Sequence, residues 1–172
     1  MIGIEKSSRH QKIVGNFGEY LVCNWLSRSG FEVCVVDHTG MDVIAYNPRT
    51  KQRLGITVKS RTRITGTETS SIYIFREAKN DRQKLIDACE AFHCEPWIAV
   101  YAECDTVADL FLTSLVNYDM HKPRGKRAVD GWGMTKRHKS AYAEDPEVKH
   151  IQIEFRSDPN WWRQRTRQRE TE

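Results

Sequence analysis

The sequence predicts an α/β fold in which a central mixed β-sheet is flanked by helices. A helical pattern over residues 8–29 is followed by three short strand patterns, at 31–36, 40–46 and 54–59. A second helical pattern precedes residues 97–102, which form a nearly continuous apolar run. Such a run suits a strand that is covered on both faces, so helices are expected on both sides of the sheet.

Length and composition favour one domain. A chain of 172 residues can bury roughly 70% of the surface that it exposes when unfolded. We expect a single domain over residues 1–156, with a core at about 8–102 and a C-terminal extension at about 103–156. The basic segment 157–172 is expected to be a flexible tail.

Charge and cysteine content indicate the setting of the protein. The net charge of +4 is compatible with an acidic partner. The five cysteines are an odd number and contain no CxxC pair, which favours reduced thiols and a cytoplasmic location over a disulfide framework. The sequence shows no secretory signal and no apolar run long enough to span a membrane, so neither export nor membrane insertion is expected.

The first helix is predicted from its boundaries and its periodicity. Ser8 and Gln11 have the spacing of a capping box, and Gly30 is suited to end the helix in a left-handed conformation. The apolar residues recur at helical spacing. They are Ile13, Phe17, Leu21, Val22, Trp25 and Leu26.

Glu19 lies on or beside the predicted buried stripe of this helix. Val22, Cys23 and Leu26 follow it by three, four and seven residues, and Gly15 precedes it by four. In the simpler interpretation, Glu19 is a boundary residue whose aliphatic stem packs while its carboxylate stays in water. In the functional interpretation, the carboxylate points toward a site.

Residues 40–46 and 54–59 are predicted to form a β-hairpin, because a polar turn with Asn and Pro separates them. One turn geometry places Asp42 opposite Thr57, and a turn shifted by one residue pair places it opposite Lys59. Either register brings an acid and a base together. A lysine on so apolar a strand needs such a partner.

The second half of the core contains a loop, a helix and a strand. Residues 60–71 read as a polar loop, and 72–75 as a short strand. Asn80 is a candidate cap for the second helix, with Gln83 at its third position. Residues 97–102 then return to the sheet.

The C-terminal extension is predicted to contain two strands separated by a basic segment. Residues 110–116 are predicted to form a strand, and residues 151–155 alternate between apolar and polar, as in a half-exposed strand. The segment 118–139 is expected to be a long loop that leads into a short helix. Its basic residues are Lys122, Arg124, Lys126, Arg127, Lys136, Arg137 and Lys139.

The placement of three residues resembles the PD-(D/E)XK nuclease superfamily, in its Holliday junction resolvase-like and restriction endonuclease-like forms. Glu19 lies on the first helix, Asp42 opens the second strand within Gly40-Met41-Asp42, and Lys59 ends the third strand within Thr57-Val58-Lys59. The resemblance covers about residues 8–102 and implies an α-β-β-β-α-β core. It rests on order and spacing as much as on residue identity.

The resemblance implies a metal-dependent endonuclease that hydrolyses phosphodiester bonds of DNA. Asp42 would be the main ligand of Mg²⁺ (or Mn²⁺), with the carbonyl oxygen of Val58 as a second ligand. Glu19 would bind a metal or orient a metal-bound water. Lys59 would stabilise charge near the scissile phosphate or assist proton removal, and Gln83 is a candidate auxiliary residue.

Thr57 departs from the superfamily pattern, which has an acidic residue at this position. A neutral hydroxyl is a poor ligand for Mg²⁺, and Glu68 or Glu77 could supply the missing carboxylate. A degenerate module that binds nucleic acid without cleaving it is therefore an alternative to an active nuclease. A third possibility is that Asp42 and Lys59 form an ordinary ion pair between strands.

The expected partner is duplex or branched DNA. The chain continues from the predicted site with residues that could contact a phosphate backbone. They are Lys59, Ser60, Arg61 and Arg63. Lys136 and Arg137 form part of a second basic group. The resemblance also implies a homodimer, because cutting two strands commonly uses two such sites.

Overall fold

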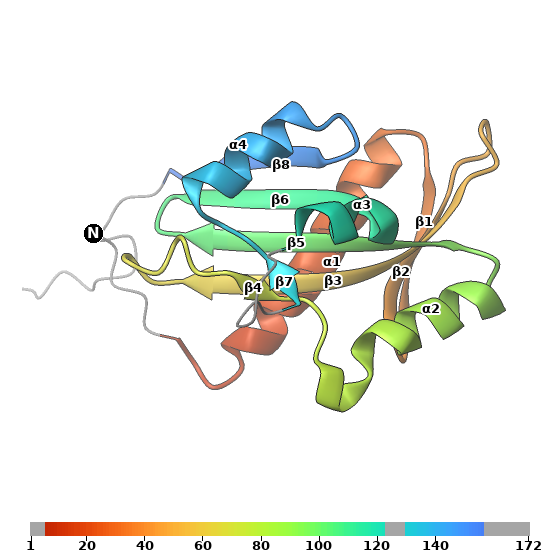
Figure 1. Ribbon diagram of the computed structural model, residues 1–172, viewed down its shortest axis with the longest axis horizontal. Helices are drawn as coiled ribbons and strands as arrows, with labels where there is room; N and C mark the ends of the chain where they lie inside the picture. Colours follow the sequence, from red (N-terminus) through yellow and green to blue (C-terminus); the bar gives the residue numbers. More distant parts are fainter. Residues whose placement is uncertain (1–5, 123–129, 157–172) are drawn as a thin grey trace, which may run out of the picture.

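A six-stranded mixed β-sheet forms the centre of the protein (Figure 1). The computed structural model describes residues 6–122 and 130–156, apart from the side chain of Asp37. The strand order is β1-β2-β3-β5-β6-β8. These strands are β1 (Glu32–His38), β2 (Met41–Tyr46), β3 (Arg53–Arg63), β5 (Glu95–Cys104), β6 (Val107–Ser114) and β8 (Lys149–Glu154).

Helix α1 covers one face of the sheet, and helices α2, α3 and α4 lie on the other face (Figure 1). A small two-stranded sheet, β4 with β7, also packs on the second face. These elements are α1 (His10–Arg28), α2 (Asp81–Ala91), α3 (Leu115–His121), α4 (Lys136–Glu144), β4 (Ile72–Tyr73), β7 (Gly131–Trp132) and the 3-10 turn η1 (Glu77–Lys79).

The predicted fold class is confirmed. Neighbouring strands of the main sheet are antiparallel except β3 and β5, which are parallel and are connected through α2. A parallel pair requires a crossover connection of this kind. The observed order of one helix, three strands, a second helix and a further strand is the predicted core. Strands β6 and β8 extend the sheet beyond β5.

The sheet separates two hydrophobic cores. Toward α1, Val22 and Leu26 pack on Ile56 and Ala99. Toward α2, Leu85 and its neighbours pack on alternate residues of the same strands, such as Ile98 and Val100. Since strand side chains alternate between faces, each residue of β3 can be assigned to one core by its position.

The buried stripe of α1 differs from the prediction. Ile13 is 61% exposed and Phe17 is 44% exposed, whereas Val14 and Gly18 are buried. Gly18 lies against β3, where an added Cβ would come within 2.1 Å of the Ser60 hydroxyl oxygen. In the first half of the helix, residues beside the predicted stripe therefore face the sheet, whereas Val22 and Leu26 of the predicted stripe are buried.

Several element boundaries also differ. Arg9 precedes α1 without a side-chain cap, so the predicted Ser8 capping box is wrong, while Gly30 has the expected positive φ of 86°. The strand predicted at 110–116 ends at Ser114, whose hydroxyl caps α3 instead. Residues 123–129, which hold part of the predicted basic segment, and the tail 157–172 lie outside the described residues.

None of the helices in the described part of the chain is long and apolar enough to cross a membrane.

Candidate active site

A chain of hydrogen bonds links Lys59, Thr57 and Asp42. The Lys59 ammonium donates to the Thr57 hydroxyl oxygen over 3.2 Å. The Thr57 hydroxyl donates in turn to Oδ2 of Asp42 over 3.1 Å. Thr57 is almost fully buried, whereas Asp42 and Lys59 are half-buried. The threonine therefore connects the acid to the base through its hydroxyl.

The register of the β2–β3 hairpin explains this arrangement. Tyr46 pairs with Arg53 and Val43 with Ile56, which is the first of the two predicted registers and places Asp42 opposite Thr57. The β2–β3 ladder ends at the Val43–Ile56 pair, and Met41 pairs with His38 of β1. Because β2 turns away here, its backbone no longer pairs with the next residues of β3.

The carboxylate of Asp42 accepts a hydrogen bond that the backbone of a paired strand would otherwise accept. Its Oδ2 accepts the backbone N–H of Val58 over 2.6 Å. In an extended strand the N–H and C=O of one residue point to the same side, so the carbonyl of Val58 also lies on the side of Asp42. The carboxylate and this carbonyl are two oxygen donors at one opening of the sheet.

The site faces α2. Thr57 and Lys59 share a face of β3 with Gly55, because they are separated from it by two and four residues. An added Cβ at Gly55 would lie 2.5 Å from Sγ of Cys89, a residue of α2. Helix α1 covers the opposite face, which is that of Val58 and Ser60.

The basic residues after Lys59 differ in exposure. Arg61 is exposed and Arg63 is half-buried, whereas Ser60 is only 7% exposed and lies under Gly18. Arg63 donates to the carbonyl of Thr67, and its Nε is buried without a hydrogen-bond partner among the described residues. Burial lowers the pKa of the Arg63 guanidinium below its ordinary value.

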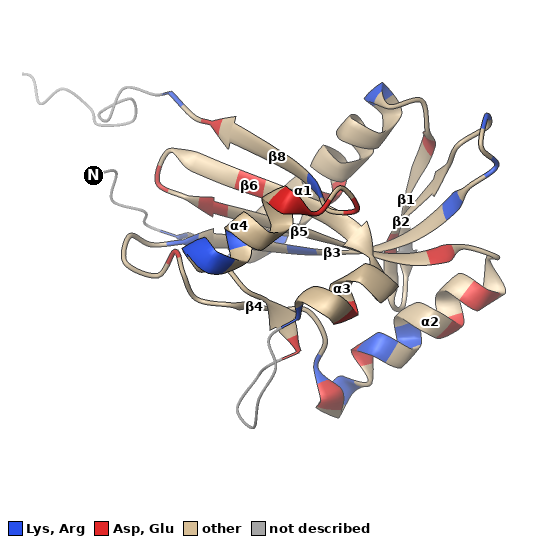
Figure 2. Ribbon diagram, turned by 45° about the horizontal axis from the view of Figure 1, so that its top comes forward, with Lys and Arg blue, Asp and Glu red and all other residues tan. Residues whose placement is uncertain are grey.

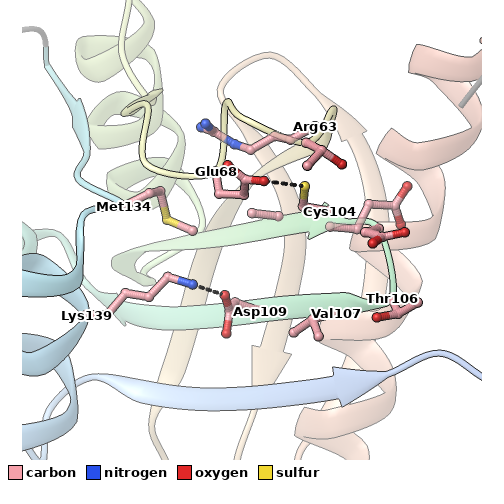
Figure 3. Close-up of a pocket in the computed structure, with 12 residues that line it drawn as sticks. Arg63, Glu68, Cys104, Thr106, Val107, Asp109, Met134 and Lys139 are labelled. Carbon is pink, nitrogen blue, oxygen red and sulfur yellow. Dashed lines mark hydrogen bonds and ion pairs between the residues drawn. The ribbon is translucent and has the colours of Figure 1, made fainter. Parts of the chain in front are cut away.

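Arg63 borders a cavity of about 260 Å³ at the end of β3 (Figure 3). On its other side, Lys139 of α4 reaches Asp109 of β6 over 2.5 Å. Glu68 and Cys104 are hydrogen-bonded to each other between them, with 3.7 Å from sulfur to oxygen. The end of β3 and helix α4 therefore line the same cavity.

Lys136 and Arg137 are exposed at the start of α4. Figure 2 shows basic residues both at this helix start and along β3. Since Arg63 and Lys139 line the same cavity, the end of β3 and helix α4 lie on one side of the sheet. These two elements are distant in the sequence but lie on the same face of the sheet.

The other two predicted site residues lie on helices. Glu19 is half-buried and directly follows Gly18, the residue of α1 that abuts Ser60. Its negative charge raises the pKa of Cys23, after the larger effect of burial. The convergence of Glu19 with Asp42 stays a prediction.

Gln83 is exposed on α2 and donates to Asp87 over 2.7 Å. Among the described residues, none of its hydrogen bonds reaches Asp42 or Lys59. The suggested auxiliary role of Gln83 therefore also stays a prediction.

Asp81 is an acidic residue near the site that the sequence did not single out. It begins α2 and forms an ion pair with Arg76 over 2.9 Å. Partial burial raises the pKa of its carboxyl, but the hydrogen bond and charge of Arg76, together with the charge of Lys59, lower it overall. No motif marks Asp81, because its proximity to Lys59 depends on where α2 packs.

The donor set at Asp42 suits a hard cation. Its donors are a carboxylate and a backbone carbonyl, and Mg²⁺ is commonly held by one or two carboxylates while it keeps several waters. In residues 6–122 and 130–156, no group of three or more His, Cys, Asp or Glu side chains forms a metal cluster. These donors therefore suit a cation that keeps several water ligands, and not one that is coordinated by protein atoms alone.

The fold and the site define an α/β protein with an acid, a hydroxyl and a lysine joined where two strands separate. No protein-family model matches the chain, and no curated protein is similar to it. A solved structure of Hjc, a Holliday junction resolvase from the archaeal hyperthermophile Archaeoglobus fulgidus, is similar over 81% of this chain and 83% of that one. The TM-score is 0.46 and the sequence identity is 16%.

Proposed function

We propose that this protein is a metal-dependent endonuclease that hydrolyses phosphodiester bonds of DNA. The observation that carries the proposal is the linked Asp42, Thr57 and Lys59 at the point where β2 leaves β3. Phosphodiester hydrolysis develops negative charge on the attacking, nonbridging and leaving oxygens. A site with one acid to hold a cation and one ammonium beside it meets that requirement.

The residues have separate tasks in this proposal. Asp42 and the carbonyl of Val58 would hold Mg²⁺ or Mn²⁺, with Glu19 as a predicted further ligand. Such a cation neutralises phosphate charge and lowers the pKa of bound water. Lys59 would stabilise charge on the phosphate, and Thr57 would hold the ammonium in position through its hydroxyl.

DNA contact is proposed for the exposed basic residues on the side of the site. Arg61 lies in β3 two residues after Lys59, and Lys136 and Arg137 are exposed at the start of α4. Ser60 is left out because its side chain packs beneath α1. We also propose that the protein is a homodimer, since two paired sites suit a two-stranded substrate.

The second candidate is a nucleic-acid-binding module without catalysis. Thr57 favours it, because a neutral, buried hydroxyl stands at the position of the usual acidic ligand. Its hydroxyl already bridges Lys59 and Asp42, so these residues could serve as a structural pair. This candidate predicts DNA binding that is independent of divalent cations.

The test is cleavage of linear, supercoiled and four-way-junction DNA with Mg²⁺, with Mn²⁺ or with a chelator. We expect cleavage that requires the cation and that Asp42→Asn abolishes. Asp87→Asn is the control, because Asp87 is an exposed acid of α2 that bonds to Gln83. Binding without cleavage would support the second candidate, and neither binding nor cleavage would refute both.

A further inference from the structure

The proposed site has one clear acidic ligand and a position for another. At Asp42, Oδ2 is already engaged by Thr57 and Val58. A divalent cation beside Lys59 also meets the repulsion of the ammonium. A second carboxylate from outside the β2–β3 hairpin would offset that repulsion and hold the cation more tightly.

Helix α2 packs closely against the start of β2. Gly40 has a φ of 99°, and an added Cβ would lie 2.4 Å from the carbonyl oxygen of Lys84. It would also lie 2.8 Å from the backbone nitrogen of Leu85. Strand β2 begins at Met41, directly after Gly40, so Asp42 is the second residue of a strand that starts at the second turn of α2.

Asp81 lies one helical turn before this contact and on the same side of α2. Residues four apart on a helix are neighbours, and Leu85 is completely buried against the sheet. The side chain of Asp81 is accordingly only 17% exposed although it belongs to the first residue of the helix. It therefore faces the side of the sheet to which Asp42, Thr57 and Lys59 belong.

Two kinds of observation agree on this placement. The packing of Gly40 on α2 brings the start of β2 to the helix. In line with this packing, the pKa of the Asp81 carboxyl is raised by burial but lowered overall by the hydrogen bonds and charge of Arg76 and, to a smaller extent, by the charge of Lys59. Asp42 reaches Lys59 through Thr57, so Lys59 is close to both acids.

The other acidic candidates are less well placed. Glu68 is exposed, accepts the Gly66 N–H and lines the cavity beside Arg63. Arg63 lies four residues beyond Lys59 along β3. Glu77 is exposed in η1. Asp87 is also exposed and lies farther along α2.

We infer that Asp81 is the second carboxylate of the proposed active site, where it binds the divalent cation together with Asp42 in place of the acid missing at Thr57. The inference rests on the proposed function. Arg76 holds the carboxylate when no cation is bound, and this ion pair is easily given up because the Arg76 side chain is 58% exposed.

Calorimetric titration of the DNA-free protein with Mn²⁺ tests this role without relying on activity. We expect Asp42→Asn and Asp81→Asn each to weaken Mn²⁺ binding by about tenfold or more, while Asp81→Glu retains part of the affinity. Asp87→Asn should bind Mn²⁺ as the wild type does. Thermal unfolding of each variant checks that the fold is kept.

Arg76→Gln is the second variant, because it leaves Asp81 in place and removes only its partner. Binding of Mn²⁺ should become tighter if Arg76 competes with the cation, since no ion pair then has to be broken. A structural role of the Arg76–Asp81 pair predicts unchanged Mn²⁺ affinity, which would count against the inference.

The outcomes separate this inference from the proposed function. If Asp81→Asn binds Mn²⁺ like the wild type while Asp42→Asn does not, Asp81 is not a ligand and the proposed nuclease site stands without it. If the wild type binds no Mn²⁺, the inference and the proposed metal dependence both fail. Equal losses in Asp42→Asn and Asp81→Asn, with no loss in Asp87→Asn, support both.

Discussion

Asp109 is expected to make the protein sensitive to acid through a measurable change in unfolding free energy. It is 4% exposed on β6 and accepts hydrogen bonds from Lys139 of α4 and from His150 and Gln152 of β8. Burial alone raises the pKa of its carboxyl. The hydrogen bonds from His150 and Lys139 outweigh burial and lower the pKa from its ordinary 3.8 to about 2.

The magnitude follows from this difference in pKa. One pKa unit corresponds to about 1.4 kcal/mol, so the difference between 3.8 and about 2 contributes about 2.4 kcal/mol. Because the pKa is lower in the folded state, the contribution is complete above pH 3.8 and is lost as the pH falls toward 2. Protonation then weakens the side-chain links from Asp109 to Lys139 of α4 and to His150 of β8.

Urea unfolding of the wild type and of Asp109→Asn at a series of pH values between about 5 and 2 measures this contribution. The wild type should lose about 2.4 kcal/mol more than the variant over this interval. Asp145, whose pKa is also lowered to about 2, contributes equally in both proteins. Glu154→Gln, which changes an exposed acid of β8, is the control.

The same dependence on pH in the wild type and in Asp109→Asn would refute this reasoning. It would mean that the Asp109 carboxyl titrates alike in the folded and unfolded states. The hydrogen bonds from α4 and β8 would then not favour its ionised form.

Further predictions concern packing, catalysis and DNA contact. Gly18→Ala should lower the unfolding free energy by about 1–3 kcal/mol, because the new methyl group meets the Ser60 hydroxyl; if Ser60→Ala restores none of the loss, this contact is not the cause. Lys59→Met should slow DNA cleavage while binding in a gel shift persists, and a parallel loss of both would argue against a role in the chemical step. Arg61→Ala should reduce the salt dependence of DNA binding by about one ion, whereas Lys51→Ala in the β2–β3 turn should not; equal slopes would exclude a phosphate contact by Arg61.

The local elements of the core could be predicted from the sequence, because their signals are short-range. The alternation in β-strands and the turn residues after Tyr46 were sufficient to predict the hairpin. The choice between its two registers required the closed turn, in which the Asn47 N–H donates to the carbonyl of Gln52 over 2.9 Å. That bond fixes Tyr46 opposite Arg53 and hence Asp42 opposite Thr57.

The orientation of α1 could not be predicted from its apolar periodicity. The pattern is wide enough to fit two neighbouring faces, and Ile13 and Phe17 were assigned to the wrong one. The close approach of Gly18 to Ser60 decides between them. A residue without a side chain leaves no hydrophobic signal in the sequence, although here it sets the rotation of the helix.

The sequence by itself determined the mixed α/β architecture and the meeting of Asp42 with the Thr57-Val58-Lys59 strand, because both depend on local periodicity and on a short hairpin. The tertiary structure decided that Thr57 mediates the contact between Asp42 and Lys59 and that α2 packs against the start of β2 at Gly40. The helix joins two parallel strands and packs on one face of the sheet. Such long-range packing is not encoded in the spacing of any motif.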